Sequence, residues 1–232
     1  MELSATIPFS SPKPAHDAVV VLHGLFASTR SMEKVCRRLS DVGYRAINWG
    51  YPTLCSSVET TARRLQDTLH ALQQDTTVRT INFLTHSMGG IIARQLIQHG
   101  SIDKIRRMVM LAPPNAGSHL TRVSLGPFRG ILPAIEQIRE TTDSFVNQLN
   151  DLRGVEVGVI AAARDFIVRV ENTRLAEQRD HRVIPCTHFG LPKCDTAIGL
   201  SLDFLKHGGF ERPQESAKPE FALSDNAIPR AA

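Results

Sequence analysis

Long hydrophobic runs are missing from this sequence. No stretch approaches the roughly 18 apolar residues of a membrane-spanning helix, and the longest apolar runs, residues 18–22 and 108–112, have the length of strands. The N-terminal residues 1–17 contain no basic segment followed by an apolar core. We therefore expect no transmembrane helix and no signal peptide in the sequence as given, and a cytoplasmic location.

Cysteines and aromatic residues are also few. The four cysteines form no CxxC pair and no zinc-ligand spacing, so we expect reduced thiols, with a disulfide between Cys186 and Cys194 as the alternative. Aromatic residues make up 6% of the chain, and its 27 Lys and Arg residues form neither a stripe nor an arginine-rich tract. Despite the net charge of +4, these features argue against nucleic-acid binding.

Motifs for metals and nucleotides are lacking too. The chain has nine histidines, but it contains no HExxH, no EF-hand loop, no GxGxxG and no GxxxxGK[ST]. We therefore expect no catalytic metal and no cofactor, while a structural calcium ion remains open.

The middle of the chain alternates short apolar runs with longer helical patterns, which is typical of a parallel sheet wrapped by helices. With 232 residues, of which 42% are hydrophobic, the chain suits one domain. The uninterrupted apolar runs favour strands that are covered on both faces. The fold class is therefore α/β, with strands predicted at 18–24, 44–52, 80–87, 104–113, 155–165 and 181–186, and helices at 29–42, 57–74, 88–99 and 194–207.

Three segments lie outside this alternation. Residues 1–16 are predicted as an N-terminal extension and residues 210–232 as a polar tail, which leaves 17–209 for the α/β domain. The segment of about 115–150 is too long for a simple strand-to-helix connection. We expect it to form a small cap insertion over the carboxyl ends of the strands, where open α/β sheets bind ligands.

The strongest functional signal is the sequence THSMGG at residues 85–90, between a predicted strand and a predicted helix. A serine at a sharp strand-to-helix turn projects its hydroxyl from the sheet, and small residues two positions before and after it allow the backbone to turn. Thr85 stands where this motif has glycine, and Gly89 occupies the second small position. The motif predicts Ser87 as a nucleophile.

With this motif the chain resembles the α/β-hydrolase superfamily, in particular its bacterial lipase and esterase branch, over roughly residues 17–207. The sequence HGLF at residues 23–26 is similar to the lipase loop that helps to form the oxyanion hole. The resemblance implies that the backbone N–H groups of Leu25 and Met88 stabilise the charge on the carbonyl oxygen. His23 itself is expected to pack this loop.

The resemblance also implies a chain order of nucleophile, acid and histidine. Asp165 closes the predicted strand 155–165, and His188 follows the predicted last strand, so the predicted triad is Ser87, Asp165 and His188. Asp180 and His181 are the alternatives; Asp180 belongs to a charged run, and His181 precedes the last strand instead of following it.

A third resemblance is the turn APPNAGS at residues 112–118, where lipases often have histidine in place of Asn115. We expect this turn to have a structural role and carry no catalytic residue over from it. Phe26, Phe128 and Leu132 are expected to line the substrate pocket. The alternative is that the apolar residues of 115–150 complete the core beneath a rigid lid.

The expected function is hydrolysis of acyl esters through an acyl-enzyme. The alternatives are an acyl thioesterase or transacylase with the same triad, and a non-catalytic binding protein that has kept the fold. The expected partner is a small-molecule or lipid acyl ester, and a transient contact with a membrane surface is an option. No stable protein partner and no nucleic acid are implied.

Overall fold

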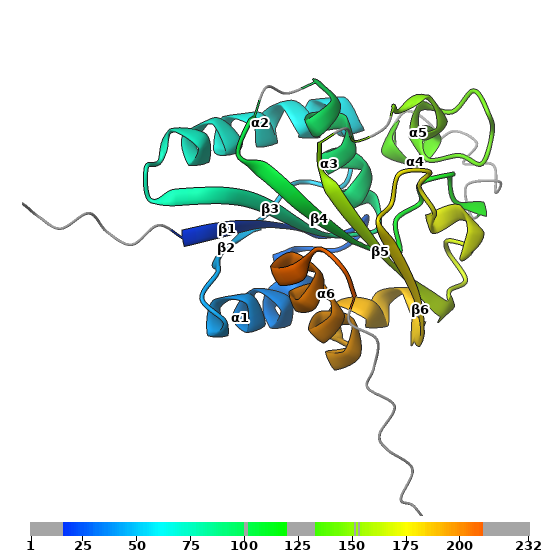
Figure 1. Cartoon of the computed structure of the whole chain (residues 1–232). Coiled ribbons are helices and arrows are strands. Elements are labelled where there is room, and N and C mark those ends of the chain that lie inside the picture. The colour runs from blue at the N-terminus through cyan, green and yellow to red at the C-terminus, as the bar shows by residue number, and fades with distance from the viewer. Residues whose placement is uncertain (1–15, 100–101, 120–132, 151, 153, 211–232) are drawn as a thin grey trace, which may run out of the picture.

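A computed structural model describes residues 16–99, 102–119, 133–150, 152 and 154–210. Its centre is a sheet of six parallel strands in the order β2-β1-β3-β4-β5-β6 (Figure 1). The predicted α/β class is therefore confirmed. The strands are β1 (His16–Leu22), β2 (Arg45–Trp49), β3 (Val78–His86), β4 (Ile105–Leu111), β5 (Glu156–Arg164) and β6 (Asp180–Thr187).

Helices cover both faces of the sheet (Figure 1). The predicted helix 29–42 begins as a 3-10 turn, η1 (Thr29–Met32), and continues as α1 (Glu33–Asp41). One face carries α1 and α6 (Asp195–His207), and the other carries α2 (Val58–Gln74) and α3 (Met88–His99). The four predicted helices and six predicted strands therefore all occur, with ends shifted by a few residues.

The core lies in two layers because the central strands are apolar on both faces. In β1, Val19 and Val21 pack with α1 and α6, whereas Val20 and Leu22 pack with α2 and α3. The matching face of α2 repeats at helical spacing, with Val58, Ala62, Leu65, Leu69 and Leu72 buried. The uninterrupted apolar run in β1 follows directly from this two-sided burial.

The order of the strands reverses at β1. The chain runs from β1 to β2 on one side and then crosses to β3 on the other, so the connections after β1 and β3 leave toward opposite faces (Figure 1). Leu22 pairs with Thr85 in the register of these two strands, which places the HGLF loop beside the serine turn. Open α/β sheets bind ligands in the crevice at such a reversal.

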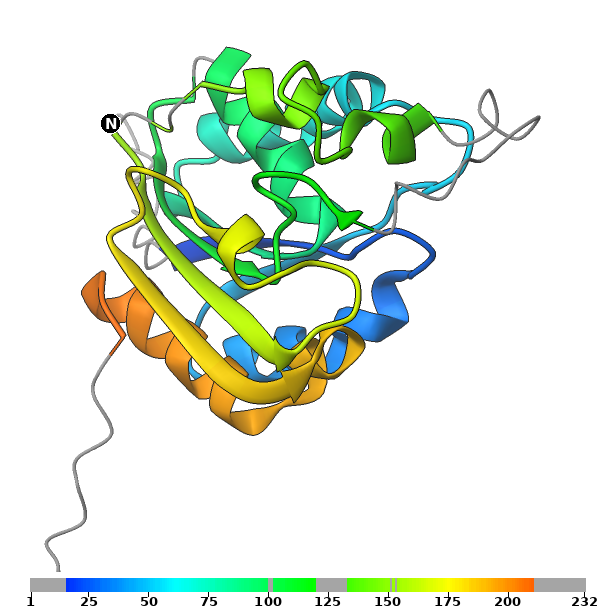
Figure 2. The same cartoon turned by 90° about the vertical axis from the view of Figure 1, so that its right-hand side faces the viewer.

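The described part of the insertion packs on the helical layer above the sheet. Its short helices α4 (Pro133–Gln137) and α5 (Phe145–Gln148) lie beside the carboxyl ends of the strands (Figures 1 and 2). Gln137 accepts a hydrogen bond from the amide of Val58 at 2.8 Å and donates one to Glu59 at 2.7 Å. Ala134, Ile138 and Val146 are buried in the core with α2 and α3.

The sequence left two roles open for the insertion, lining a pocket or completing the core. Its described apolar residues Ala134, Ile138 and Val146 complete the core. The two predicted pocket residues of this segment, Phe128 and Leu132, lie outside the described residues. A role for residues 115–150 as an acyl-binding cap therefore stays a prediction.

The first and last described residues of the domain both make ordered contacts. His16 already belongs to β1, and its amide donates to the carbonyl of Thr77 at 2.7 Å. Phe210 is 4% exposed and its ring centroid lies 5.1 Å from that of Phe204. The predicted domain bounds of 17–209 stay a prediction, because the segments on either side lie outside the described residues.

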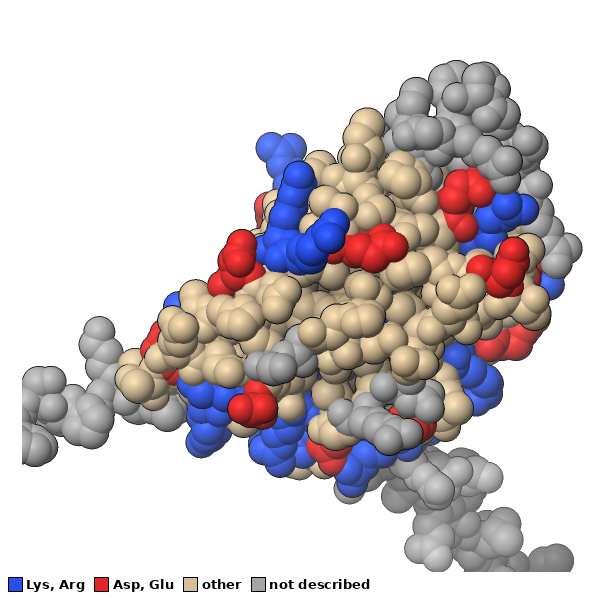
Figure 3. Space-filling model, turned by 90° about the horizontal axis from the view of Figure 1, so that it is seen from above, with Lys and Arg blue, Asp and Glu red and all other residues tan. Residues whose placement is uncertain are grey.

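Charges of both signs are mixed on the face above α2 and α3. In Figure 3, Lys and Arg side chains lie next to Asp and Glu side chains at several places, separated by uncharged surface. Among the residues that the structure describes, no helix is both long enough and apolar enough to cross a bilayer.

Candidate active site

Ser87 occupies the sharp turn between β3 and α3. Its φ of 52° lies in the left-handed region, which non-glycine residues adopt at an energetic cost and which is common at functional turns. The turn is held by the Ser87 amide, which donates to the carbonyl of Leu111 at 2.8 Å, and by the amide of Gly90, which donates to the carbonyl of Ser87 at 2.9 Å. This is the geometry that the serine motif predicts.

The residues around the serine have to be small. A Cβ added to Gly89 would lie 2.6 Å from the carbonyl oxygen of His23, closer than atoms can approach. Thr85 stands in place of the first glycine of the motif, and its hydroxyl donates to the carbonyl of Val109 on β4 at 3.4 Å. Gly90 leaves the space for it, since a Cβ there would lie 3.2 Å from the Thr85 hydroxyl oxygen.

Asp165 and His188 are joined by a hydrogen bond of 2.8 Å between the Asp165 carboxylate and Nδ1 of His188. Both side chains are buried, with 2% and 4% exposed. The other carboxylate oxygen accepts the amides of Ile167 at 2.8 Å and Val168 at 2.9 Å. The carboxylate is therefore fixed on the loop after β5, and the histidine at the start of the 3-10 segment η5 (His188–Lys193).

The charge state of Asp165 follows from two opposing effects. Burial alone would raise the pKa of this carboxyl, but the hydrogen bond from His188 and the two amide donors outweigh burial, so its pKa is lowered. A carboxylate that stays ionised can hold Nδ1–H of the imidazole and leave Nε2 free to exchange protons.

The structure joins two of the three predicted triad residues directly, Asp165 and His188. The ring of His86, the residue before Ser87, lies 4.8 Å from the ring of His188. Within the described residues no hydrogen bond joins the Ser87 hydroxyl to His188. Such bonds are often long in free hydrolases and shorten when substrate is bound.

His86 is a site residue that the sequence reasoning missed. Its Nε2 donates to the backbone carbonyl of His188 at 3.0 Å. Burial lowers the pKa of His86 to about 3, so the ring is neutral near pH 7. Its position directly before Ser87 was the available signal.

The HGLF loop is fixed by the ring of His23. This ring stacks on Tyr51 at a centroid distance of 4.2 Å, the Tyr51 hydroxyl donates to the His23 carbonyl at 2.5 Å, and Nδ1 of His23 donates to the Gly24 carbonyl at 3.0 Å. His23 therefore packs the loop, as expected. Of the two predicted oxyanion donors, Leu25 lies on this loop and Met88 opens α3, where the amides have no partner within the helix.

The turn at residues 112–118 braces the loop that carries Asp165. Asn115 is buried, donates to the carbonyl of Thr173 at 2.7 Å and accepts from Arg94 at 3.2 Å. Ser118 donates to the carbonyl of Ile167 at 2.6 Å. The structural role expected for this turn agrees with these contacts.

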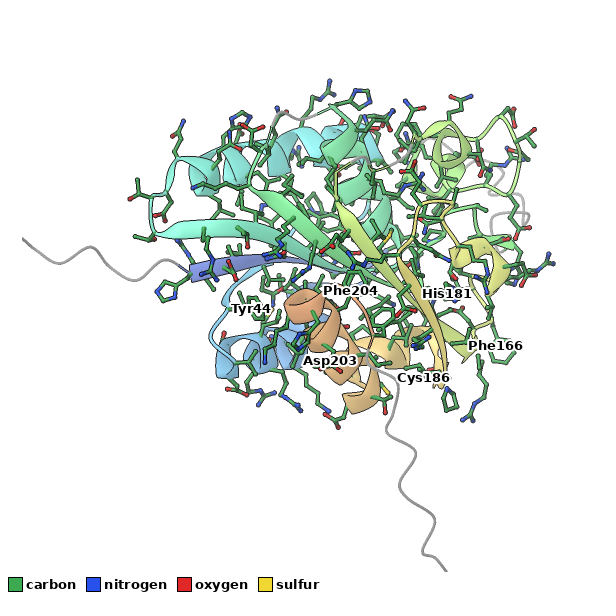
Figure 4. All side chains as sticks on the ribbon, in the orientation of Figure 1. Tyr44, Phe166, His181, Cys186, Asp203 and Phe204 are labelled. Atoms are coloured by element: carbon green, nitrogen blue, oxygen red, sulfur yellow. The ribbon has the colours of Figure 1, made fainter. Side chains whose placement is uncertain are left out.

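The alternative pair, Asp180 and His181, lies at the opposite end of β6 from His188. Nε2 of His181 is 2.9 Å from the hydroxyl of Thr173, and Asp180 accepts the amide of Phe210 at 2.9 Å. Seven residues of extended strand separate His181 from His188, which corresponds to roughly 23 Å. Figure 4 shows His181 and Cys186 at separate places along this strand. The structure does not bring these two residues to Ser87.

Side chains that could bind a metal are dispersed. All four cysteines are free thiols, including Cys186 and Cys194. Among the residues that the structure describes, no three His, Cys, Asp or Glu side chains gather as ligands.

A cleft of about 460 Å³ opens beside the serine turn, between the HGLF loop and η5. Phe26, Phe189 and His86 are among the residues that line it. Phe26 was predicted to line the substrate pocket and does line this cleft.

Each of three exposed phenylalanines directly follows a predicted site residue: Phe26 is 67% exposed, Phe189 61% and Phe166 80%. Figure 4 shows Phe166 where β5 ends.

Solved structures with the same fold include hydrolases from several organisms. A lipase from Bacillus licheniformis, BlEst2, is 18% identical, with a TM-score of 0.68 over 88% of this chain and 96% of its own. Lipase B from Aspergillus fumigatus is 16% identical, with a TM-score of 0.69 over 86% of this chain and 55% of its own. A putative non-heme bromoperoxidase from Mycobacterium tuberculosis, BpoC, is 14% identical, with a TM-score of 0.64 over 84% and 94%.

These similarities establish the α/β-hydrolase fold, and the predicted resemblance to that superfamily is confirmed at the level of the fold. No curated protein matches the sequence. Residues 4–125, more than half of the 232 residues, match a family model described as a domain of unknown function, DUF7379. The chain therefore belongs to the DUF7379 family and has the α/β-hydrolase fold.

Proposed function

We propose that the protein is a serine hydrolase that cleaves carboxylic esters of acyl groups. The observation that carries the proposal is the buried hydrogen bond of 2.8 Å between Asp165 and His188, next to a serine held at a left-handed turn. The lipases that share the fold add support, but they are less than 20% identical to this chain. Because the same fold hosts many reactions, the residues at the site must carry the argument.

In the proposed acylation step, Nε2 of His188 removes the proton from the Ser87 hydroxyl as its oxygen attacks the ester carbonyl. The imidazolium that forms is stabilised by Asp165, which stays ionised because its pKa is lowered. The amides of Leu25 and Met88 donate to the oxyanion, and one such donor is worth about 3 to 4 kcal/mol. His188 then protonates the departing alcohol.

Water completes the cycle. His188, again neutral, removes a proton from a water molecule that attacks the acyl carbonyl, and the collapse of the second tetrahedral intermediate releases the acid and restores the Ser87 hydroxyl. His86 is a positioning residue in this scheme, since its hydrogen bond to the His188 carbonyl fixes the main chain beneath the base.

The experiment is a hydrolysis assay of the full chain with p-nitrophenyl acetate, butyrate and octanoate, and with an S-phenyl thioester of the same acyl groups. Ser87→Ala should reduce kcat/KM on every hydrolysed substrate by at least about a thousandfold. The matched control is Ser40→Ala, which removes an exposed hydroxyl on α1 and should retain activity. Wild-type protein without turnover, or an active Ser87→Ala variant, would contradict the proposal.

A further inference from the structure

The cleft beside the serine turn combines two aromatic walls with two positive charges. Phe189 lies edge-on to the ring of His188, with centroids 5.2 Å apart. Phe26 directly follows the proposed oxyanion donor Leu25 and has a φ of 56°. Arg30 and Lys193 line the same cleft. The lining of the cleft therefore contains both aromatic and basic side chains.

The two cations of the cleft have no acidic partner. Among the described residues, neither the Arg30 nor the Lys193 side chain makes an ion pair or hydrogen bond, and no Asp or Glu lines the cleft. The neighbouring cations differ, because Lys34 and Arg38 both pair with Asp195, at 2.9 and 3.2 Å. Arg30 and Lys193 therefore face the cleft without the acidic partner that Lys34 and Arg38 have.

We propose that the cleft selects esters that carry an anionic group, a carboxylate or a phosphate, held by Arg30 and Lys193 while the apolar part of the substrate lies between Phe26 and Phe189. This inference rests on the proposed hydrolase function and deepens it by naming the substrate class. A volume of about 460 Å³ falls in the range of small-molecule sites. A guanidinium can bind a carboxylate or phosphate through two parallel hydrogen bonds.

The anion could belong to a soluble ester or to the headgroup of a lipid in a bilayer. The chemistry of recognition is the same in both cases, so the experiment has a soluble arm and a membrane arm. In both arms the full-length protein is compared with Arg30→Gln, Lys193→Gln and the double variant. The matched control is Arg37→Gln, which removes an exposed cation from α1 outside the cleft.

The soluble arm uses two pairs of substrates, each an anionic carboxylate and its neutral methyl ester, and compares each pair between wild type and variants. One pair places the charge in the acyl half: 4-nitrophenyl hydrogen glutarate and its methyl ester. The other places it in the alcohol half: 4-acetoxybenzoate and its methyl ester. In at least one pair, kcat/KM for the anionic member should exceed that for the neutral member by about fivefold to tenfold at low salt, since each exposed ion pair contributes up to roughly a factor of five.

This preference should fall toward unity in the double variant and at high ionic strength, whereas Arg37→Gln should keep it. The membrane arm measures turnover and co-sedimentation with vesicles of phosphatidylglycerol and of phosphatidylcholine. A preference for phosphatidylglycerol that the double variant loses, without a preference among the soluble pairs, would assign the anion to a lipid headgroup.

Equal rates within both soluble pairs together with equal behaviour on both kinds of vesicle would overturn the inference. So would a preference that the double variant retains. These outcomes leave ester hydrolysis intact, whereas wild-type protein that cleaves no ester at all would overturn the proposed function and this inference with it.

Discussion

Nε2 of His86 lies 3.0 Å from the backbone oxygen of His188, so the residue before the proposed nucleophile holds the main chain of the proposed base. This hydrogen bond joins the end of β3 to the start of η5, two segments 102 residues apart. The serine turn and the segment that carries His188 are therefore linked directly by this hydrogen bond.

The first prediction concerns the protonation of His86. Its pKa is lowered by burial from about 6.5 in an unfolded chain to about 3 in the folded protein. Between these pH values the ring is protonated in the unfolded chain but neutral in the folded protein. The free energy of unfolding is therefore highest above pH 6.5 and decreases as the pH falls toward 3. His86→Gln cannot titrate here and should flatten the dependence of the unfolding free energy on pH by about 1.4 kcal/mol per pH unit.

Urea unfolding across pH 4 to 7 measures this dependence, and His70→Gln, at an exposed position on α2, is the matched control. If the slope of the unfolding free energy against pH is the same in His86→Gln as in wild type, the pKa of His86 is not lowered in the folded protein.

The second prediction separates the proposed acid and base from their sequence neighbours. His188→Ala should lower kcat/KM on p-nitrophenyl butyrate to near the Ser87→Ala level, and Asp165→Asn should lower it by about a thousandfold or more, because the imidazole loses its orienting carboxylate. His181→Ala and Asp180→Asn, which lie at the other end of β6, should stay within about threefold of wild type. An inactive His181→Ala variant that is folded by circular dichroism would contradict the assignment.

The third prediction uses two glycines that differ in their surroundings. Gly89→Ala places a methyl group 2.6 Å from the backbone oxygen of His23, so we expect a loss of about 1 to 3 kcal/mol in unfolding free energy together with lower turnover. Gly199→Ala, in α6 with no atom within 4 Å of the added Cβ, should stabilise the fold by about 0.5 to 1 kcal/mol. Thermal unfolding of both variants provides the comparison, and a stable, fully active Gly89→Ala would refute the close approach.

The fourth prediction concerns the insertion. If Leu132 contacts the acyl chain, Leu132→Asp should depress turnover of octanoate esters more than that of acetate esters while leaving the circular dichroism spectrum unchanged. Ile138→Asp should instead unfold the protein or lower its Tm strongly, because Ile138 is only 5% exposed within the core. Equal losses on all chain lengths in Leu132→Asp would place the acyl pocket elsewhere.

The layered fold could be predicted from the sequence because its signals are local. The run AVVVL at residues 18–22 predicts a strand buried on both faces, and the stripe of α2 from Val58 to Leu72 predicts one buried helix face. Chain order and strand ends were also sufficient to select Asp165 and His188, which the structure joins by a hydrogen bond. These residues sit where a strand ends, and strand ends are visible as composition changes.

Contacts between distant segments could not be predicted in this way. Nothing in the sequence pairs His86 with the carbonyl of His188, or stacks His23 on Tyr51, because both contacts depend on the order of the strands in the sheet. For the same reason Phe26 was predicted to line the cleft but Phe189 was not, because Phe189 comes from η5, a distant part of the chain. Phe210 looked like part of a polar tail, and its burial depends on packing against Phe204.

If Ser87 is the activated nucleophile of an acyl hydrolase and His188 is its base, a fluorophosphonate should label one serine of the full chain. Peptide mass spectrometry should find a single adduct, on the peptide that contains Ser87, which is lost in Ser87→Ala and strongly slowed in His188→Ala. An adduct on any other serine, or equally fast labelling of Ser87 in His188→Ala, would contradict these two roles.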